Sequence, residues 1–165
     1  MIVPEDIRDY FVRFEDQADN MLSSECIPED TGENTIIKWY YGSIRAESEM
    51  HALNWLRSKG CGPMTYGMHH KMYNHWSGQC LFHGVEVEKV LVLNPYSVPD
   101  WVRGRIYDME YAISRELNCK MLVDVHPGQF GMDIDHNLLI IDGGVVVHNA
   151  SNYEKAKWYQ DIMVY

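Results

Sequence analysis

The chain has 165 residues, of which 46% are hydrophobic and 23% are charged, and this composition excludes a disordered or fibrous protein. No apolar run approaches the roughly eighteen residues of a membrane span. The N-terminus, MIVPEDIRDYF, is acidic and lacks the basic-then-apolar pattern of a secretory signal. These features predict a single cytoplasmic domain over residues 1–165, with reduced cysteines and no contact with membranes.

The formal net charge of −10 is concentrated near the N-terminus, because residues 1–33 hold ten acidic residues and only two arginines. An acidic surface repels nucleic-acid backbones and attracts basic proteins. We therefore expect a protein partner rather than nucleic acid as a direct ligand. The alternative is that these charges only form a solvated helix face.

The first third of the chain predicts a helix, a linker, a strand and a second helix. Apolar residues recur every three or four positions over 4–22, which indicates an amphipathic helix. The turn-rich residues 23–34 predict a linker. The β-branched and aromatic segment 35–41 predicts a strand, and a helix over 44–59 is expected to end at Gly60.

Residues 60–79 show no periodicity, so they predict a long functional loop. The apolar run within 81–94 then predicts a strand of a covered sheet. Ser97 and Asp100 have the spacing of a capping box for a helix over 97–117. Its apolar positions recur at spacings of three and four: Val98, Val102, Ile106, Met109, Ile113 and Leu117.

The C-terminal third predicts further strands. Residues 121–125 indicate a short buried strand, and the apolar runs 138–141 and 145–147 flank Asp142-Gly143-Gly144, a typical hairpin turn. Strands alternating with helices predict an α/β fold, with a mixed β-sheet flanked by helices and preceded by the N-terminal acidic amphipathic helix.

The segment around 60–83 carries candidate metal ligands and interface residues. Imidazole and thiolate groups bind zinc, which makes a divalent metal site one hypothesis and a polar surface loop without a cofactor the favoured one. The candidate ligands are His69, His75, Cys80 and His83, with His70 in the same segment. The aromatic residues Tyr66, Tyr73 and Trp76 are of the types enriched at protein interfaces.

A second cluster of polar residues follows the expected strand 121–125. Its carboxylates and imidazoles could hold a divalent cation or act as acid and base, or they could cap turns. The members are Asp124, His126, Asp133, Asp135 and His136.

The string DHNLLIIDGGVVVHNASN at 135–152 resembles the phospholipase D-like superfamily. The motif of that family is H-x-K-x4-D, followed by a glycine turn, an apolar strand and a small, Asn-rich segment. The strand and helix order over 35–152 is also similar to one repeat of the family fold. The resemblance implies a phosphodiesterase site. Together with the polar cluster above, it gives the candidate catalytic residues His126, Asp135, His136 and Asp142 and the candidate ligand-binding residues Asp124, Asp133, Asn137 and Asn149.

The motif departs from the family pattern at its lysine. Aligning Asp142 with the family aspartate puts Asp135 at the histidine position and Asn137 at the lysine position. Aligning His136 with the nucleophile instead puts Leu138 at the lysine position. Both alignments lack the cation that would hold phosphate charge. In single-motif members of the family two chains supply the histidines, so the resemblance also leaves a homodimer open.

The favoured hypothesis is therefore a non-catalytic interaction or regulatory protein on a phospholipase D-like scaffold. One version is an acidic antagonist of a nucleic-acid-binding or defence protein. The alternatives are a hydrolase that uses the cluster 124–142 and a small-molecule sensor.

Overall fold

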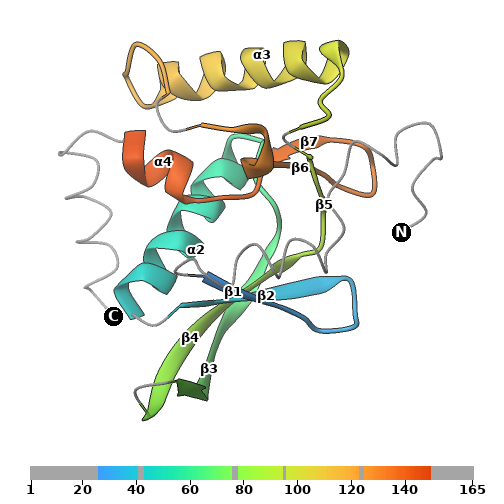
Figure 1. The fold of residues 1–165 in the computed structure, drawn as a ribbon. Coiled ribbons are helices and arrows are strands. Elements are labelled where there is room, and N and C mark those ends of the chain that lie inside the picture. The colour runs from blue at the N-terminus through green and yellow to red at the C-terminus, as the bar shows by residue number, and fades with distance from the viewer. Residues whose placement is uncertain (1–25, 41–42, 76–77, 95, 123–124, 150–165) are drawn as a thin grey trace.

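The computed structural model describes residues 26–40, 43–75, 78–94, 96–122 and 125–149, which form two antiparallel sheets and the helices packed on them (Figure 1). The predicted acidic helix over 4–22 lies outside these residues. An α/β fold is confirmed, but the predicted mixed sheet is wrong within the described residues, because every strand pair there is antiparallel.

The larger sheet has the strand order β1-β2-β4-β3. Its strands are β1 (Cys26–Asp30), β2 (Thr35–Tyr40), β3 (Thr65–His75) and β4 (Gly78–Glu88). Alternate side chains of β2 point to opposite faces, as in any strand. Ile36 and Tyr40 join the main core, whereas Ile37 and Trp39 form a small cluster with Phe82 on the other face.

Helix α2 (Ser43–Ser58) packs on the main-core face of this sheet. Its buried residues Ala46, Leu53 and Leu56 follow the helical period. Gly60 ends the helical segment as predicted: its φ of 78° suits glycine, and its N–H donates to the Arg57 carbonyl oxygen at 2.9 Å.

The smaller sheet has the order β5-β6-β7 and lies between α2 and α3 (Figure 1). The remaining elements are β5 (Leu91–Val92), α3 (Asp100–Glu116), the 3-10 turn η2 (Pro127–Gln129), β6 (Phe130–Met132), β7 (Leu138–Ile140) and α4 (Gly144–Asn149). The predicted apolar stripe of α3 is confirmed, since Val102, Ile106 and Ile113 are buried.

Two predicted loops contain strands. The segment 60–79 is not a structureless loop, because β3 occupies 65–75 and pairs along its length with β4. Strand β3 lies at the edge of its sheet and carries polar residues on both faces, so it shows no apolar alternation. The predicted linker 23–34 contains β1, another edge strand, where Pro28 is tolerated.

The hairpin predicted around Asp142-Gly143-Gly144 is a helix start instead. Asp142 Oδ1 accepts the Gly144 N–H at 2.8 Å, which caps the first turn of α4. Burial of Val145 and Val146 stabilises the helix despite their preference for strands.

Two local predictions at either end of α3 are also wrong. The capping box of Ser97 and Asp100 is absent, because Pro99 is the N-cap residue and no side chain caps the helix. The described residues of 121–125 form no strand, and Met121 is 70% exposed.

Gly84 and Gly104 provide a matched test of this packing. A Cβ atom on Gly84 would lie 2.5 Å from Ile37 Cγ2 and 2.9 Å from the Trp39 ring. Gly84→Ala should therefore lower the free energy of unfolding by about 1–3 kcal/mol. Gly104→Ala, on an α3 position with no atom within 4 Å, should raise it by about 0.5–1 kcal/mol. Urea unfolding measures both free energies. Equal changes in the two variants would contradict the close packing around Gly84.

Candidate functional site

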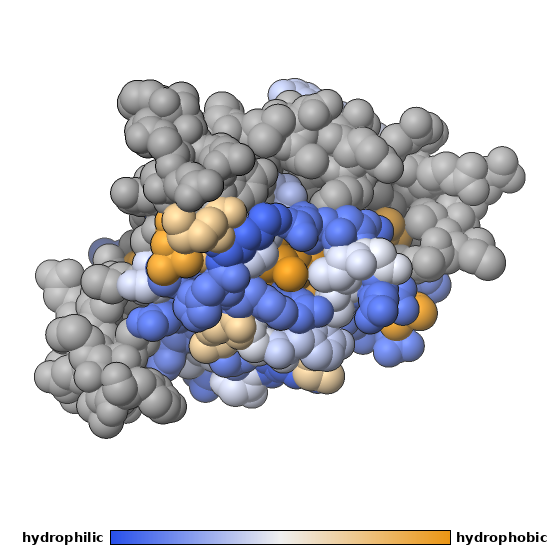
Figure 2. All heavy atoms as spheres, turned by 90° about the horizontal axis from the view of Figure 1, so that it is seen from below, coloured by the Kyte–Doolittle hydropathy of each residue, from blue (hydrophilic) through white to orange (hydrophobic). Residues whose placement is uncertain are grey.

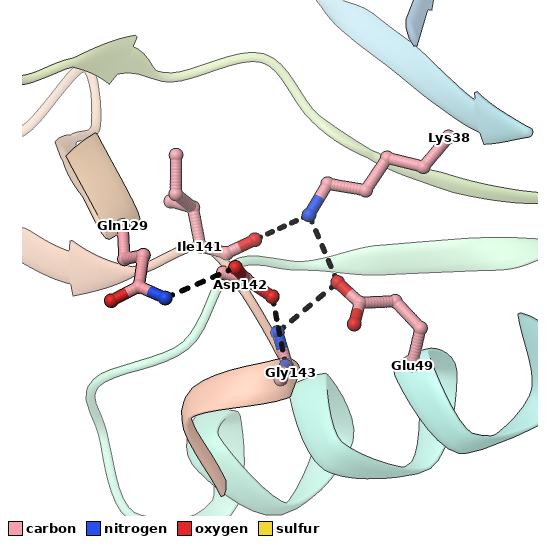
Figure 3. A network of polar contacts seen from close by, with 7 residues as sticks. Lys38, Glu49, Gln129, Ile141, Asp142 and Gly143 are labelled. Carbon is pink, nitrogen blue, oxygen red and sulfur yellow. Dashed lines mark hydrogen bonds and ion pairs between the residues drawn. The ribbon is translucent and has the colours of Figure 1, made fainter. Parts of the chain in front are cut away.

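A buried ion pair connects the larger sheet to α2. Lys38 lies on the face of β2 that carries Ile36 and Tyr40 into the core, and Glu49 lies on the inward side of α2. Lys38 Nζ donates to Glu49 Oε1 at 2.9 Å and also to the carbonyl oxygen of Ile141 (Figure 3). The Lys38 and Glu49 side chains are only 12% and 7% exposed.

The corner between β7 and α4 completes this network. The Gly143 N–H donates to Glu49 Oε1 at 3.1 Å, and Gln129 Nε2 donates to Asp142 Oδ2 at 3.3 Å (Figure 3). A Cβ atom on Gly143 would lie 2.5 Å from Glu49 Oε2, so close approach of the backbone to the carboxylate requires glycine. Residues far apart in the sequence therefore meet around one ammonium group.

Lys38, Cys26 and Tyr40 are held in their protonated forms. Burial alone would lower the pKa of Lys38, but the Glu49 and Asp142 carboxylates raise it above its usual range. Burial raises the pKa of the Cys26 thiol to about 11. The pKa of Tyr40 is also raised, by burial and by the negative charge of Glu49. An ammonium, a thiol and a phenol are poor nucleophiles, so the arrangement favours a structural role.

Sequence reasoning missed Lys38, Glu49 and Gln129. The sequence does contain a signal for Lys38 and Glu49, because each places a charged residue among the apolar residues on the buried side of its strand or helix. Lys38 alternates with Ile36 and Tyr40, and Glu49 follows Ala46 by three positions. A charge on such a stripe predicts a buried partner.

Three of the four predicted catalytic residues lie on either side of β7. Asp135 and His136 are exposed in the turn before β7, and Asp142 follows the strand. Asp133 organises that turn, since its Oδ1 accepts the N–H groups of Asp135 at 3.0 Å and Asn137 at 2.8 Å. Asp133 and Asn137 thus stabilise this turn, and a ligand-binding role is not needed to explain either residue.

His126 is connected to Asp142 through Gln129. The backbone N–H of His126 donates to Gln129 Oε1 at 2.9 Å, and the Gln129 amide donates to Asp142 Oδ2. Asn149 lies in α4, where its amide donates to the Val145 carbonyl oxygen at 2.7 Å. Asp124 lies outside the described residues.

The predicted metal ligands do not share one face of the sheet. Neighbouring residues of β3 point to opposite faces, and the partner of His83 in the register is His70 rather than His69. His69 Nε2 instead contacts Glu86 Oε2 at 2.7 Å. The side chains of His75 and Cys80 lie outside the described ones, among which no cluster of three or more His, Cys, Asp or Glu residues could hold a metal ion.

Of the predicted interface residues, Tyr66 is 54% exposed on β3. Trp76 and the side chain of Tyr73 lie outside the described part of the chain.

Comparison with known proteins found no matching family model, curated protein or solved structure. The phospholipase D-like relationship therefore stays a resemblance carried by residues 135–152. No helix in the described ranges is long and apolar enough to cross a membrane.

The network predicts a loss of stability at alkaline pH. Cys26, Tyr40 and Lys38 all have raised pKa values in the folded chain, so the unfolded chain loses these protons first as the pH rises. The free energy of unfolding should be constant near about pH 8 and fall from about pH 9 upward. Urea unfolding at a series of pH values measures this.

Cys26→Ala is the matched control for the pH profile. It removes one of the three groups, so the decrease in unfolding free energy between about pH 9 and 11 should shrink by about 2 kcal/mol. Identical profiles for this variant and the parent chain, or a parent profile that stays flat to about pH 11, would contradict the pKa directions.

Proposed function

We propose that this chain is a non-catalytic protein-binding module whose docking surface is the outer side of α3. The proposal rests on one observation, the concentration of exposed aromatic side chains between positions 96 and 111. Four residues are exposed there, Tyr96 before α3 and Trp101, Tyr107 and Tyr111 on it, at 96%, 52%, 64% and 64%. We call the surface formed by Tyr107 and Tyr111, which lie one turn apart, the aromatic face.

Helical geometry aligns this face with two arginines. Arg103, Tyr107, Tyr111 and Arg115 are spaced by four residues, so they form a row along α3 on the solvent side of its buried stripe. The Arg115 guanidinium lies 5.7 Å from the centroid of the Tyr111 ring, which is within cation–π range. This contact holds the tyrosine in an outward orientation before any partner binds.

The composition of this row fits a protein partner. Trp, Tyr and Arg are the residue types that contribute most binding energy at protein interfaces, and tyrosine loses little conformational entropy when it is buried. The arginines would pair with carboxylates of the partner. Nucleic acid fits less well, because α3 also exposes Asp100, Asp108 and Glu116 in a chain with a net charge of −10.

The position of the aromatic face supports the same conclusion. Helix α3 lies at the outer edge of the molecule, away from the larger sheet (Figure 1). The side of the molecule seen from below is mainly hydrophilic in its described residues, with scattered hydrophobic ones (Figure 2). Partner binding on α3 would therefore leave the larger sheet and its buried ion pair undisturbed.

The hydrolase hypothesis has less support. His136 and Asp142 flank opposite ends of β7, and the nucleophilic groups of the buried network are held in protonated forms. The phospholipase D-like scaffold and the antagonism of a nucleic-acid-binding or defence protein stay parts of the proposal that rest on the sequence. The acidic residues of 1–33 would then form a second contact with a basic partner.

The aromatic face can be tested with a double variant. Tyr107→Ala/Tyr111→Ala removes two exposed rings without touching the core, so its unfolding free energy should stay close to that of the parent chain. Binding to a partner isolated with the full chain should weaken by about thirtyfold or more, because each such ring contributes about 1–2 kcal/mol at an interface. Calorimetry with the purified partner measures this.

Tyr66→Ala is the matched control, since it removes an exposed tyrosine from β3. Unchanged affinity in the α3 double variant with lost affinity in Tyr66→Ala would overturn the assignment of the surface. A partner that is nucleic acid would overturn its assignment to a protein. Hydrolysis of a generic phosphodiester that disappears in His136→Ala would overturn the non-catalytic role.

A further inference from the structure

We propose that the β3–β4 hairpin holds a copper(I) site formed by His70, His83 and Met72. This site is independent of the proposed docking surface on α3.

Strand pairing brings two imidazole rings together on one face of the hairpin. His70 and His83 are direct partners in the β3–β4 register. Their Nδ1 atoms lie 2.8 Å apart, and the rings are nearly perpendicular, with centroids 4.8 Å apart. Only one of the two facing nitrogens can carry the proton of this hydrogen bond. If the donor ring takes its other tautomer, with the proton on Nε2, both Nδ1 lone pairs become available to one metal ion.

The geometry requires only a small opening of the pair. At an imidazole–metal distance of about 2.0–2.1 Å, two tetrahedral nitrogen ligands lie about 3.3 Å apart. The two nitrogens would therefore separate by about half an ångström. His70 is exposed and His83 half-buried, so side-chain rotation can supply this change without moving the strands.

Methionine residues share a face of β3 with His70, and their sulfur would determine the metal class. Residues two positions apart share one face of a strand, so Met68 and Met72 lie on the same side of β3 as His70. Met72 is 56% exposed and pairs with Leu81, itself 48% exposed. Its flexible side chain can reach an ion held between the rings. Soft thioether together with imidazole favours copper(I) over zinc and over hard cations.

The neighbouring His69 is excluded from the site. It points to the other face of the sheet, where it contacts Glu86 and lies 6.5 Å from the Trp39 ring, centroid to centroid. His69 and His70 are therefore adjacent in sequence but only one can bind the ion, which provides a matched control.

The test is an anaerobic titration of the full chain with copper(I) held by a competing chelator. Cysteine thiolates also bind copper(I), so the titration uses a background with Cys80→Ser and Cys119→Ser. Burial raises the pKa of the Cys26 and Cys61 thiols to about 11, and a chain that also carries Cys26→Ala and Cys61→Ala checks that neither thiol supplies the binding. We expect about one copper per chain, with shifts of the His70 and His83 ring nitrogen resonances in NMR spectra.

Single substitutions distinguish the proposed copper ligands from the neighbouring His69. His70→Asn and His83→Asn should each weaken copper(I) binding by about tenfold or more, whereas His69→Asn should leave it unchanged. Met72→Leu should weaken binding of copper(I) but not of zinc, since sulfur is the soft ligand.

Three results would overturn the proposal: no copper bound by the Cys-substituted chain, equal weakening by His69→Asn and His70→Asn, or no effect of Met72→Leu on copper(I). The ring resonances of the unmodified histidines decide the question even if a histidine variant fails to fold.

Discussion

The buried ammonium group of Lys38 imposes the constraint on which the rest of this structure depends. A buried charge without a partner costs several kcal/mol, so the folded chain is strongly destabilised unless a carboxylate reaches Lys38. Glu49 supplies it from α2, and the carbonyl oxygen of Ile141 accepts a second hydrogen bond. The pair therefore fixes how α2 lies on the larger sheet and where the corner after β7 attaches.

The same constraint bears on function. The groups around Lys38 already hydrogen-bond one another, because Glu49 also accepts the Gly143 N–H and Asp142 caps α4. The described side chains include no buried polar atom without a hydrogen-bond partner. The two proposals rest instead on exposed side chains of α3 and of the β3–β4 hairpin.

Elements with a clear apolar period could be predicted from the sequence. Helices α2 and α3 each present one apolar face to the core, and β2 is rich in β-branched and aromatic residues, so their patterns match the structure to within a few residues. Strand β3 could not be found this way, because an edge strand with exposed residues has no need of alternation. The valines of α4 have strand propensity, which tertiary burial overrides.

Less of the candidate site than of the fold could be predicted from the sequence. A charge on an apolar stripe identifies Lys38 and Glu49 singly, but their partnership with Gly143 depends on tertiary packing across distant segments. The polar residues at 133–137 attract attention as a cluster, yet Asp133 mainly stabilises a turn. Only the register of β3 shows that His69 and His70 lie on opposite faces of the sheet.

A double-mutant cycle on Lys38 and Glu49 tests the central claim most directly. Lys38→Met and Glu49→Gln should each lower the urea-unfolding free energy by about 3–5 kcal/mol, because each leaves the other group buried without its charged partner. The double variant should lose less than the two single variants together, by at least about 1 kcal/mol. Additive effects, or single losses below about 1 kcal/mol, would show that the fold does not depend on this ion pair.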